Sequence, residues 1–128
     1  QAQYADLAEN YIADDNYPPG TVVVFGGEQE ITVTDRVCDT RVAGVISTDP
    51  AYLMNAVAGG IPVAFTGRVP CFVKGPVRKG DRLVTSDIPG VAEVLNKDRF
   101  EIGCVIGKSL CDYENDDVTT IEIAVGRY

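Results

Sequence analysis

The residues of this chain that are best suited to chemistry are its carboxylates and cysteines, because the sequence contains no histidine. A serine or cysteine nucleophile needs a base that titrates near neutral pH, and here that base would be a carboxylate or lysine with a shifted pKa. Closely spaced acids such as Asp6 with Glu9, or Asp14 with Asp15, would act as acid and base only in a pocket that raises one pKa. Aspartate and glutamate side chains are usually exposed to solvent in folded proteins, and we expect the same of these acids. We therefore predict no catalytic residue and no enzymatic activity.

Two acidic segments, 14–16 and 112–117, carry the hard oxygen atoms that calcium prefers as ligands. Their spacing matches no EF-hand loop, which favours solvated turns. The segment from Gly75 to Gly80 lacks the Gly-Lys-Ser/Thr ending and the helix of a phosphate-binding loop, so it predicts a plain turn. We predict no metal site and no cofactor-binding residue, and we expect exposed loops near Asp14 to Tyr17 and Asp112 to Asp117.

The four cysteines, Cys38, Cys71, Cys104 and Cys111, include no pair with C-x-x-C spacing. Cys71 and Cys104 lie in apolar runs, where a free cysteine behaves as a small hydrophobic residue. Cys38 and Cys111 border polar segments and would pair if their Cα atoms lay within about 7 Å. Four cysteines are few for a disulfide scaffold. The sequence therefore predicts four free thiols, with a Cys38–Cys111 bond as the alternative.

The formal charge is −8, which disfavours contact with nucleic-acid phosphates, and no apolar run approaches the roughly 18 residues of a membrane span. We predict neither nucleic-acid binding nor membrane insertion. The cations that adjoin predicted strand ends are expected to form salt bridges, for which the nearby acids are Asp35, Asp39 and Asp81, or subunit contacts. These cations are Arg36, Arg41, Arg68, Arg78, Lys79, Arg82 and Arg99.

Short runs rich in valine, isoleucine and threonine alternate with glycine and proline turn signals, which predicts strands joined by tight turns. The segments 21–25 and 30–34 are expected to form a hairpin across Gly26-Gly27. Gly44 indicates a bulge or a close backbone approach, and Pro70 indicates a sheet edge or a bend. The predicted strands are 4–13, 21–25, 30–34, 42–47, 62–74, 82–86, 91–94, 103–109 and 119–125.

One short helical turn is predicted from Asp49 to Ala58, with Asp49 as its cap, Pro50 in its first position and Tyr52, Leu53 and Met54 along it. In the long strand 62–74, strict alternation predicts that Val63, Phe65, Gly67, Val69, Cys71 and Val73 share one face. The predicted fold is all-β: a single compact barrel, sandwich or β-clip-like roll of about nine short strands with at most one short helix.

Several segments resemble a known kind of protein: ADLAENY at 5–11, PGTVV at 19–23, TRVAGVIS at 40–47, GRVPC at 67–71 and KGDRLVTS at 79–86. Together they resemble the β-rich C-terminal domain of tail-fibre and other virion structural proteins of tailed phages, particularly cyanophages. The A-D-x-A-E opening and the GVIS segment are also distantly similar to the peptidase G2 family of autoprocessing chaperone domains.

The resemblance implies that residues 1–128 are a single β domain at the C-terminal part of a longer fibrous protein. Such a domain caps a homotrimer in the virion and sets the register of its three chains. It is made in the host cytoplasm. Its partners are other virion proteins and a glycan or protein receptor on the host surface. The peptidase G2 similarity implies an alternative, an autoproteolytic intramolecular chaperone, but no catalytic residue is transferred from it. A non-enzymatic bacterial binding or assembly module is the remaining alternative.

Overall fold

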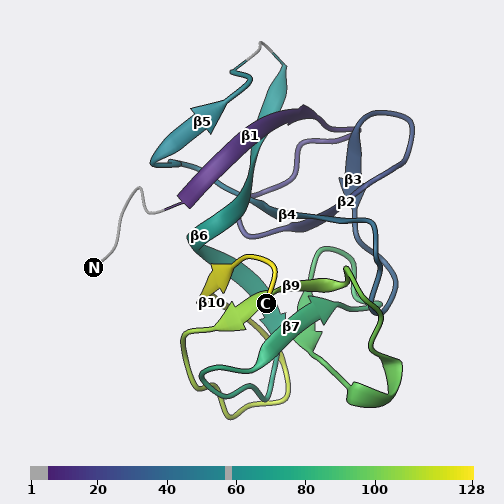
Figure 1. Cartoon of the computed structure of the whole chain (residues 1–128), viewed down its shortest axis with the longest axis vertical. Coiled ribbons are helices and arrows are strands. Elements are labelled where there is room, and N and C mark those ends of the chain that lie inside the picture. Colours follow the sequence, from purple (N-terminus) through teal and green to yellow (C-terminus); the bar gives the residue numbers. More distant parts are fainter. Residues whose placement is uncertain (1–5, 57–58) are drawn as a thin grey trace.

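The computed structural model describes residues 6–56 and 59–128, and Figure 1 shows that this part of the chain is built of strands. The all-β prediction is confirmed, although Tyr4 and Ala5 of the first predicted strand lie outside the described residues. The strands are β1 (Asp6–Ile12), β2 (Val22–Phe25), β3 (Ile31–Val33), β4 (Val42–Ile46), β5 (Tyr52–Met54), β6 (Gly60–Lys74), β7 (Arg82–Thr85), β8 (Ala92–Val94), β9 (Val105–Ser109) and β10 (Val118–Val125).

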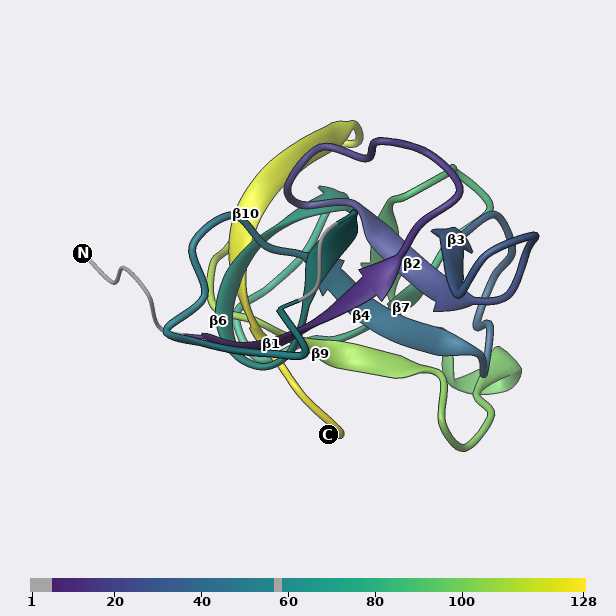
Figure 2. The same cartoon turned by 90° about the horizontal axis from the view of Figure 1, so that it is seen from above.

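Five strands close into a barrel, which confirms the barrel among the predicted architectures. The pairing runs β6, β10, β9, β7 and β8 and returns to β6. The longest contact is antiparallel, from Val118 opposite Lys74 to Val125 opposite Gly67. Figure 2 shows β10 following the curve of β6. Inside lie Cys71, Leu83 and Ile123, all fully buried, so this ring encloses most of the larger hydrophobic core.

Four of the remaining strands, β1, β2, β3 and β4, form a second ring that shares β6 with the first. The pairing runs from β1 to β6, β4, β2 and β3, and a bridge between Ala13 and Ile31 returns it to the end of β1. Val23, Ile46 and Val63 pack with Ile31 inside it. The predicted hairpin is confirmed as β2 and β3. In Figure 1 the second ring lies above the first, and β6 runs through both.

The strand β6 bends where it passes from one ring to the other. Leu7 pairs with Thr66 but Ala8 pairs with Ala64, so Phe65 is an extra residue, a β-bulge. The predicted alternation therefore holds for Val69, Cys71 and Val73, which are buried, but fails at Phe65, which is 36% exposed. Pro70 is exposed and pairs only with Glu122 of β10, which agrees with the predicted edge.

Gly44 lies at the close backbone approach that its position in β4 predicts. Its φ is +153°, and a Cβ there would lie 2.1 Å from the carbonyl oxygen of Ala64 in β6. The register between β2 and β4 also shifts next to this residue, because Val23 pairs with Gly44 whereas Val24 pairs with Val42. Glycine is required here because any side chain would separate β4 from β6.

The predicted helical turn from Asp49 to Ala58 is wrong. Tyr52–Met54 form β5, which lies parallel to β1 with Leu7 opposite Tyr52, and the amide of Ala51 donates to the carbonyl of Asp6. A helix of two or three turns gains little from its own hydrogen bonds, so pairing with the open edge of β1 prevails. Ala58 lies outside the described residues. The one helical element among those described is a 3-10 turn at Lys97–Arg99, which the sequence did not predict.

The prediction of four free thiols is also wrong, as is its Cys38–Cys111 alternative. Cys38 and Cys104 form a disulfide with a Cα–Cα distance of 5.1 Å, while Cys71 and Cys111 are free. Both bonded cysteines are buried and pack with Val84. They are 66 residues apart, and they meet because the segment between β3 and β4 packs against β7, where the amide of Cys38 donates to the carbonyl of Thr85.

We expect the double substitution Cys38→Ala/Cys104→Ala to lower the free energy of unfolding by about 2–4 kcal/mol, because it frees a long loop in the unfolded chain. Urea unfolding, with and without a reductant, measures this. Cys111→Ala is the control, with an expected change below about 0.5 kcal/mol. A double variant as stable as the oxidised wild type would contradict the prediction.

Gly44→Ala is expected to destabilise the protein by at least about 3 kcal/mol, since the new methyl group overlaps a carbonyl oxygen on the neighbouring strand. Gly80→Ala is the matched control, because Gly80 also has a positive φ but open space around it. Its cost should be only the backbone strain of about 1–2 kcal/mol. Equal losses in chemical denaturation would show that contact with Ala64 is unimportant.

Candidate functional site

A broad groove opens where the two rings meet. Its wall includes residues of β1, β4 and β6 on one side and of β7, β10 and the segment between β8 and β9 on the other. Its volume of about 1360 Å³ exceeds the roughly 300–1,000 Å³ of typical small-molecule pockets. We call it the aromatic groove, because five aromatic side chains line it together with Ile102. The aromatic residues are Tyr11, Phe25, Phe65, Phe100 and Tyr128.

The aromatic groove concentrates the exposed apolar surface of the molecule. Of the eight large hydrophobic side chains that are exposed among the described residues, five line it: Phe25, Phe65, Phe100, Ile102 and Tyr128. Ile102 is 90% exposed and Tyr128 50% exposed. Single exposed hydrophobic residues are ordinary, whereas a contiguous group of them marks a surface that binds something.

Local structure explains why these side chains face outward. The bulge in β6 turns Phe65 out of the strand's buried face. Phe25 ends β2 and contacts Tyr11 edge to face, with ring centroids 5.2 Å apart. The 3-10 turn at Lys97–Arg99, capped by the side chain of Asn96, precedes Phe100, which is also exposed. Each position is therefore fixed by a backbone feature of its own element.

The charge of the aromatic groove is opposite to that of the whole chain. Four cations and one acid line it: Arg41, Arg82, Lys97, Arg127 and Glu9. Outside it remain seven cations and eighteen acids. In the described part of the chain, Lys97 and Arg127 form no ion pair, and Arg82 donates to the backbone carbonyl of Tyr128 at 3.0 Å. The groove is therefore a basic, aromatic surface on an acidic protein.

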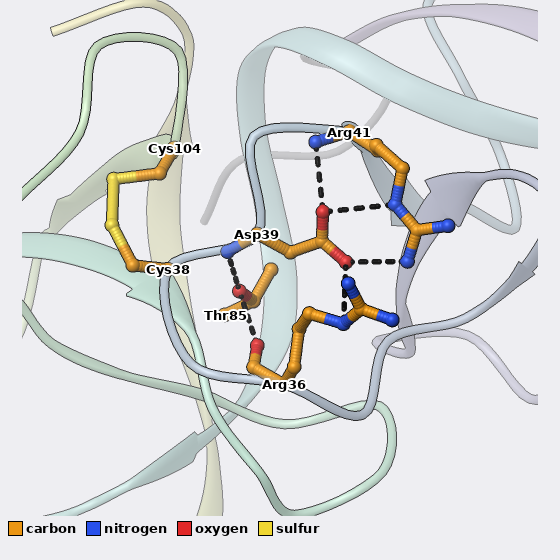
Figure 3. The surroundings of a disulfide bond; sticks show 6 residues. All are labelled: Arg36, Cys38, Asp39, Arg41, Thr85 and Cys104. Atoms are coloured by element: carbon orange, nitrogen blue, oxygen red, sulfur yellow. Dashed lines mark hydrogen bonds and ion pairs between the residues drawn. A yellow bond between two sulfur atoms is a disulfide. The ribbon is translucent and has the colours of Figure 1, made fainter.

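The disulfide holds the two walls of the groove together. Cys38 lies next to the segment that places Thr40 and Arg41 on one wall, and Cys104 lies between Gly103 and Val105 on the other. Figure 3 shows a second tie, in which the amide of Asp39 donates to the Thr85 hydroxyl at 2.6 Å. The Thr85 hydroxyl in turn donates to the carbonyl of Arg36 at 2.8 Å. This segment is thereby joined to β7 as well.

The carboxylate of Asp39 positions Arg41 on the groove wall. It accepts from the amide, Nε and Nη2 of Arg41 at 2.9, 3.1 and 2.7 Å, and Arg36 lies 3.8 Å away (Figure 3). These bonds, chiefly those from the Arg41 side chain, lower the pKa of the Asp39 carboxyl. The prediction that Arg36 and Arg41 pair with a nearby acid is confirmed for Asp39.

Two other cations form the expected salt bridges, but with acids that the sequence did not indicate. Arg68 pairs with Glu122 at 3.0 Å, and Arg78 pairs with Glu114 at 2.6 Å. Asp81 accepts from the amide of Arg78. The remaining salt bridge in the described structure joins Lys74 to Asp116. These contacts lie outside the groove and serve the fold.

The structure does not bring the paired carboxylates of the sequence together. Asp6 is buried, whereas Glu9, three residues along the same strand, lies on the groove wall. Asp14 accepts from the hydroxyls of Tyr17 and Thr32, which lower its pKa, and Asp15 accepts from the next amide. No acid and base therefore face a common substrate position in these pairs.

Both predicted acidic loops are exposed, as expected. The acids of 14–16 and of 112–117 face solvent, while Tyr17 and Tyr113 are half-buried. Within residues 6–56 and 59–128, no group of three or more histidine, cysteine or acidic side chains is arranged to hold a metal ion. The segment from Gly75 to Gly80 forms a turn, with a β-bridge between Val77 and Tyr113, rather than a phosphate-binding loop.

Two buried groups have shifted pKa values but do not line the groove. Burial raises the pKa of the Asp6 carboxyl, and a hydrogen bond with Ser47, which is also buried, opposes that shift. Burial raises the pKa of the Cys71 thiol, so this cysteine remains a thiol near neutral pH and is a poor nucleophile. The prediction that Cys71 is a free thiol in an apolar run is confirmed, whereas the burial of Asp6 was not predicted, because nothing local distinguishes a buried acid.

No protein-family model matches the chain, and no curated protein matches it. In the part of the chain that the structure describes, no helix has the length and apolar character needed to cross a membrane.

The two buried aspartates should affect stability with opposite pH dependence. The pKa of Asp39 is lower when the protein is folded, so its contribution is present above the unfolded pKa and disappears as pH falls through the folded one. Asp39→Asn should therefore cost about 1–3 kcal/mol at pH 7 and progressively less below about pH 4. The pKa of Asp6 is higher when folded, so its ionised form opposes folding at neutral pH.

Asp6→Asn should accordingly stabilise the protein at pH 7, and this advantage should shrink as acid protonates Asp6 in the wild type. Urea unfolding of the wild type and both variants between pH 3 and 7 measures the two trends. If the two differences changed in the same direction with pH, the assigned pKa shifts would be wrong.

Proposed function

We propose that this chain is a non-enzymatic structural domain that caps and registers a trimer in the distal part of a phage tail fibre. The observation that carries the proposal is the aromatic groove, an open apolar surface that is too large for a typical small-molecule pocket. The resemblance of the sequence to tail-fibre C-terminal domains supports the fibre and the virion as its setting. The proposal includes contact between this domain and a glycan or protein receptor on the host surface.

The composition of the groove supports a protein as its ligand. Interface cores are enriched in aromatic residues and arginine, and three of the chain's four phenylalanines lie here with Arg41, Arg82 and Arg127. Burial of a phenylalanine or isoleucine side chain contributes about 1.5–3 kcal/mol. Several such side chains covered at once would offset the cost of association.

The structure also supports a rigid interface. Ring closure and the disulfide fix both walls of the groove, so the backbone would lose little conformational freedom on binding. A structural domain acts by binding a partner through a surface of fixed shape, and this does not require a reactive group. The chain can therefore act by geometry alone.

Light scattering of the purified chain near neutral pH is expected to give a mass three times the 13.7 kDa of one chain. The substitution Ile102→Ser should shift the equilibrium toward the monomer by at least tenfold, because it removes a large, 90% exposed apolar side chain from the proposed interface. Tyr52→Ser, which changes another exposed apolar residue outside the groove, is the control. A wild-type monomer at every concentration up to about 1 mM would overturn the trimer.

A further inference from the structure

One edge of the molecule carries four acids that form no ion pair in the described structure. Asp14 and Asp15 follow β1, and Glu28 and Glu30 lie in the turn of the β2–β3 hairpin. The two segments are joined, since the amide of Asp14 donates to the carbonyl of Ile31 and the amide of Glu30 donates to that of Ile12. We call these four residues the acidic edge. All four are exposed.

No cation neutralises the acidic edge in the described part of the chain. Asp14 accepts from two hydroxyl groups, Asp15 from the amide of Asn16, and Glu30 from the amide of Ile12. None of the four takes part in an ion pair. The four acids therefore carry a formal charge of −4 that no ion pair within the described structure offsets.

The other acidic loop, 112–117, differs in this respect. Its Asp116 pairs with Lys74 and its Glu114 with Arg78. Its Asp112 accepts from the amide of Lys79, and its Asp117 accepts from the hydroxyl of Tyr113. This loop is already satisfied within its own chain, so the acidic edge is the better partner for an external cation.

Some of the cations that form no ion pair in the described part of the chain line the aromatic groove. Lys97 and Arg127 line it without an ion pair, and Lys108 lies with its Nζ 5.0 Å from the ring centre of Tyr128. One chain thus presents a basic groove and an acidic edge. Opposite charges on two different patches favour contact between copies and oppose contact between like patches.

We propose that the acidic edge of one copy docks in the aromatic groove of the next copy. This contact is heterologous, because the two patches differ, and heterologous contacts generate closed rings when the rotation closes. The patches also adjoin on one chain, since Nη1 of Arg41 in the groove lies 3.0 Å from the position of a Cβ on Gly26 in the β2–β3 turn. The proposal rests on the trimer put forward above and names its interface.

Charge reversal tests this pairing. Lys97→Glu/Arg127→Glu reverses the groove, and Asp15→Lys/Glu28→Lys reverses the edge. Each double variant should associate at least tenfold more weakly than the wild type by light scattering, because like charges then face each other. The fourfold variant, with both patches reversed, should recover the trimer. Adding salt should weaken the wild-type trimer as well.

The control is Lys79→Glu/Arg99→Glu, which makes the same change in net charge at exposed cations outside the groove. Thermal unfolding establishes that every variant is folded. If the wild type is a trimer and both reversed variants remain trimers, this interface is overturned but the proposed trimer still stands. Dissociation of both without recovery in the fourfold variant also overturns the pairing. A wild-type monomer rejects the trimer itself, and this interface with it.

Discussion

The rest of the structure depends on one strand, β6, which takes part in two closed rings of backbone hydrogen bonds. One part of the strand pairs with β1 and β4, and the other pairs with β10 and, at Val73, with β8. A strand can serve two rings only if it bends between them. The bulge at Phe65 and the positive φ of Gly67 provide that bend. The larger core also includes residues of both rings, so the two halves are not independent.

The aromatic groove follows from this shared strand. Two convex rings that meet along one strand leave a valley beside it, and side chains at the junction belong to neither interior. Phe65 faces outward for this reason. The disulfide then ties the segment before β4 to the segment before β9, so that the valley keeps its shape. Shape and apolar surface therefore have the same origin, the closure of both rings.

The charges of the chain are distributed unevenly between this surface and the rest of the molecule. A chain with a net charge of −8 would repel its own copies if that charge were spread evenly. Here most acids do not line the groove, and among the described residues Glu9 is its one lining acid against four cations. Separate basic and acidic patches turn a general repulsion into a preference for one orientation. Such a preference agrees with the proposed role of the chain in setting the register of a fibre.

The sequence by itself determined the local features of this protein. Alternation of valine and isoleucine with glycine turns located the main strands, and Gly44 marked a close approach, because these signals act over a few residues. The disulfide, β5 and the aromatic groove depended on tertiary structure. Cys38 and Cys104 become neighbours only because the segment between β3 and β4 packs against β7, and β5 forms because the edge of β1 is available to it. Exposure of Phe65 likewise depends on where β6 bends, which only pairing with strands distant in sequence decides.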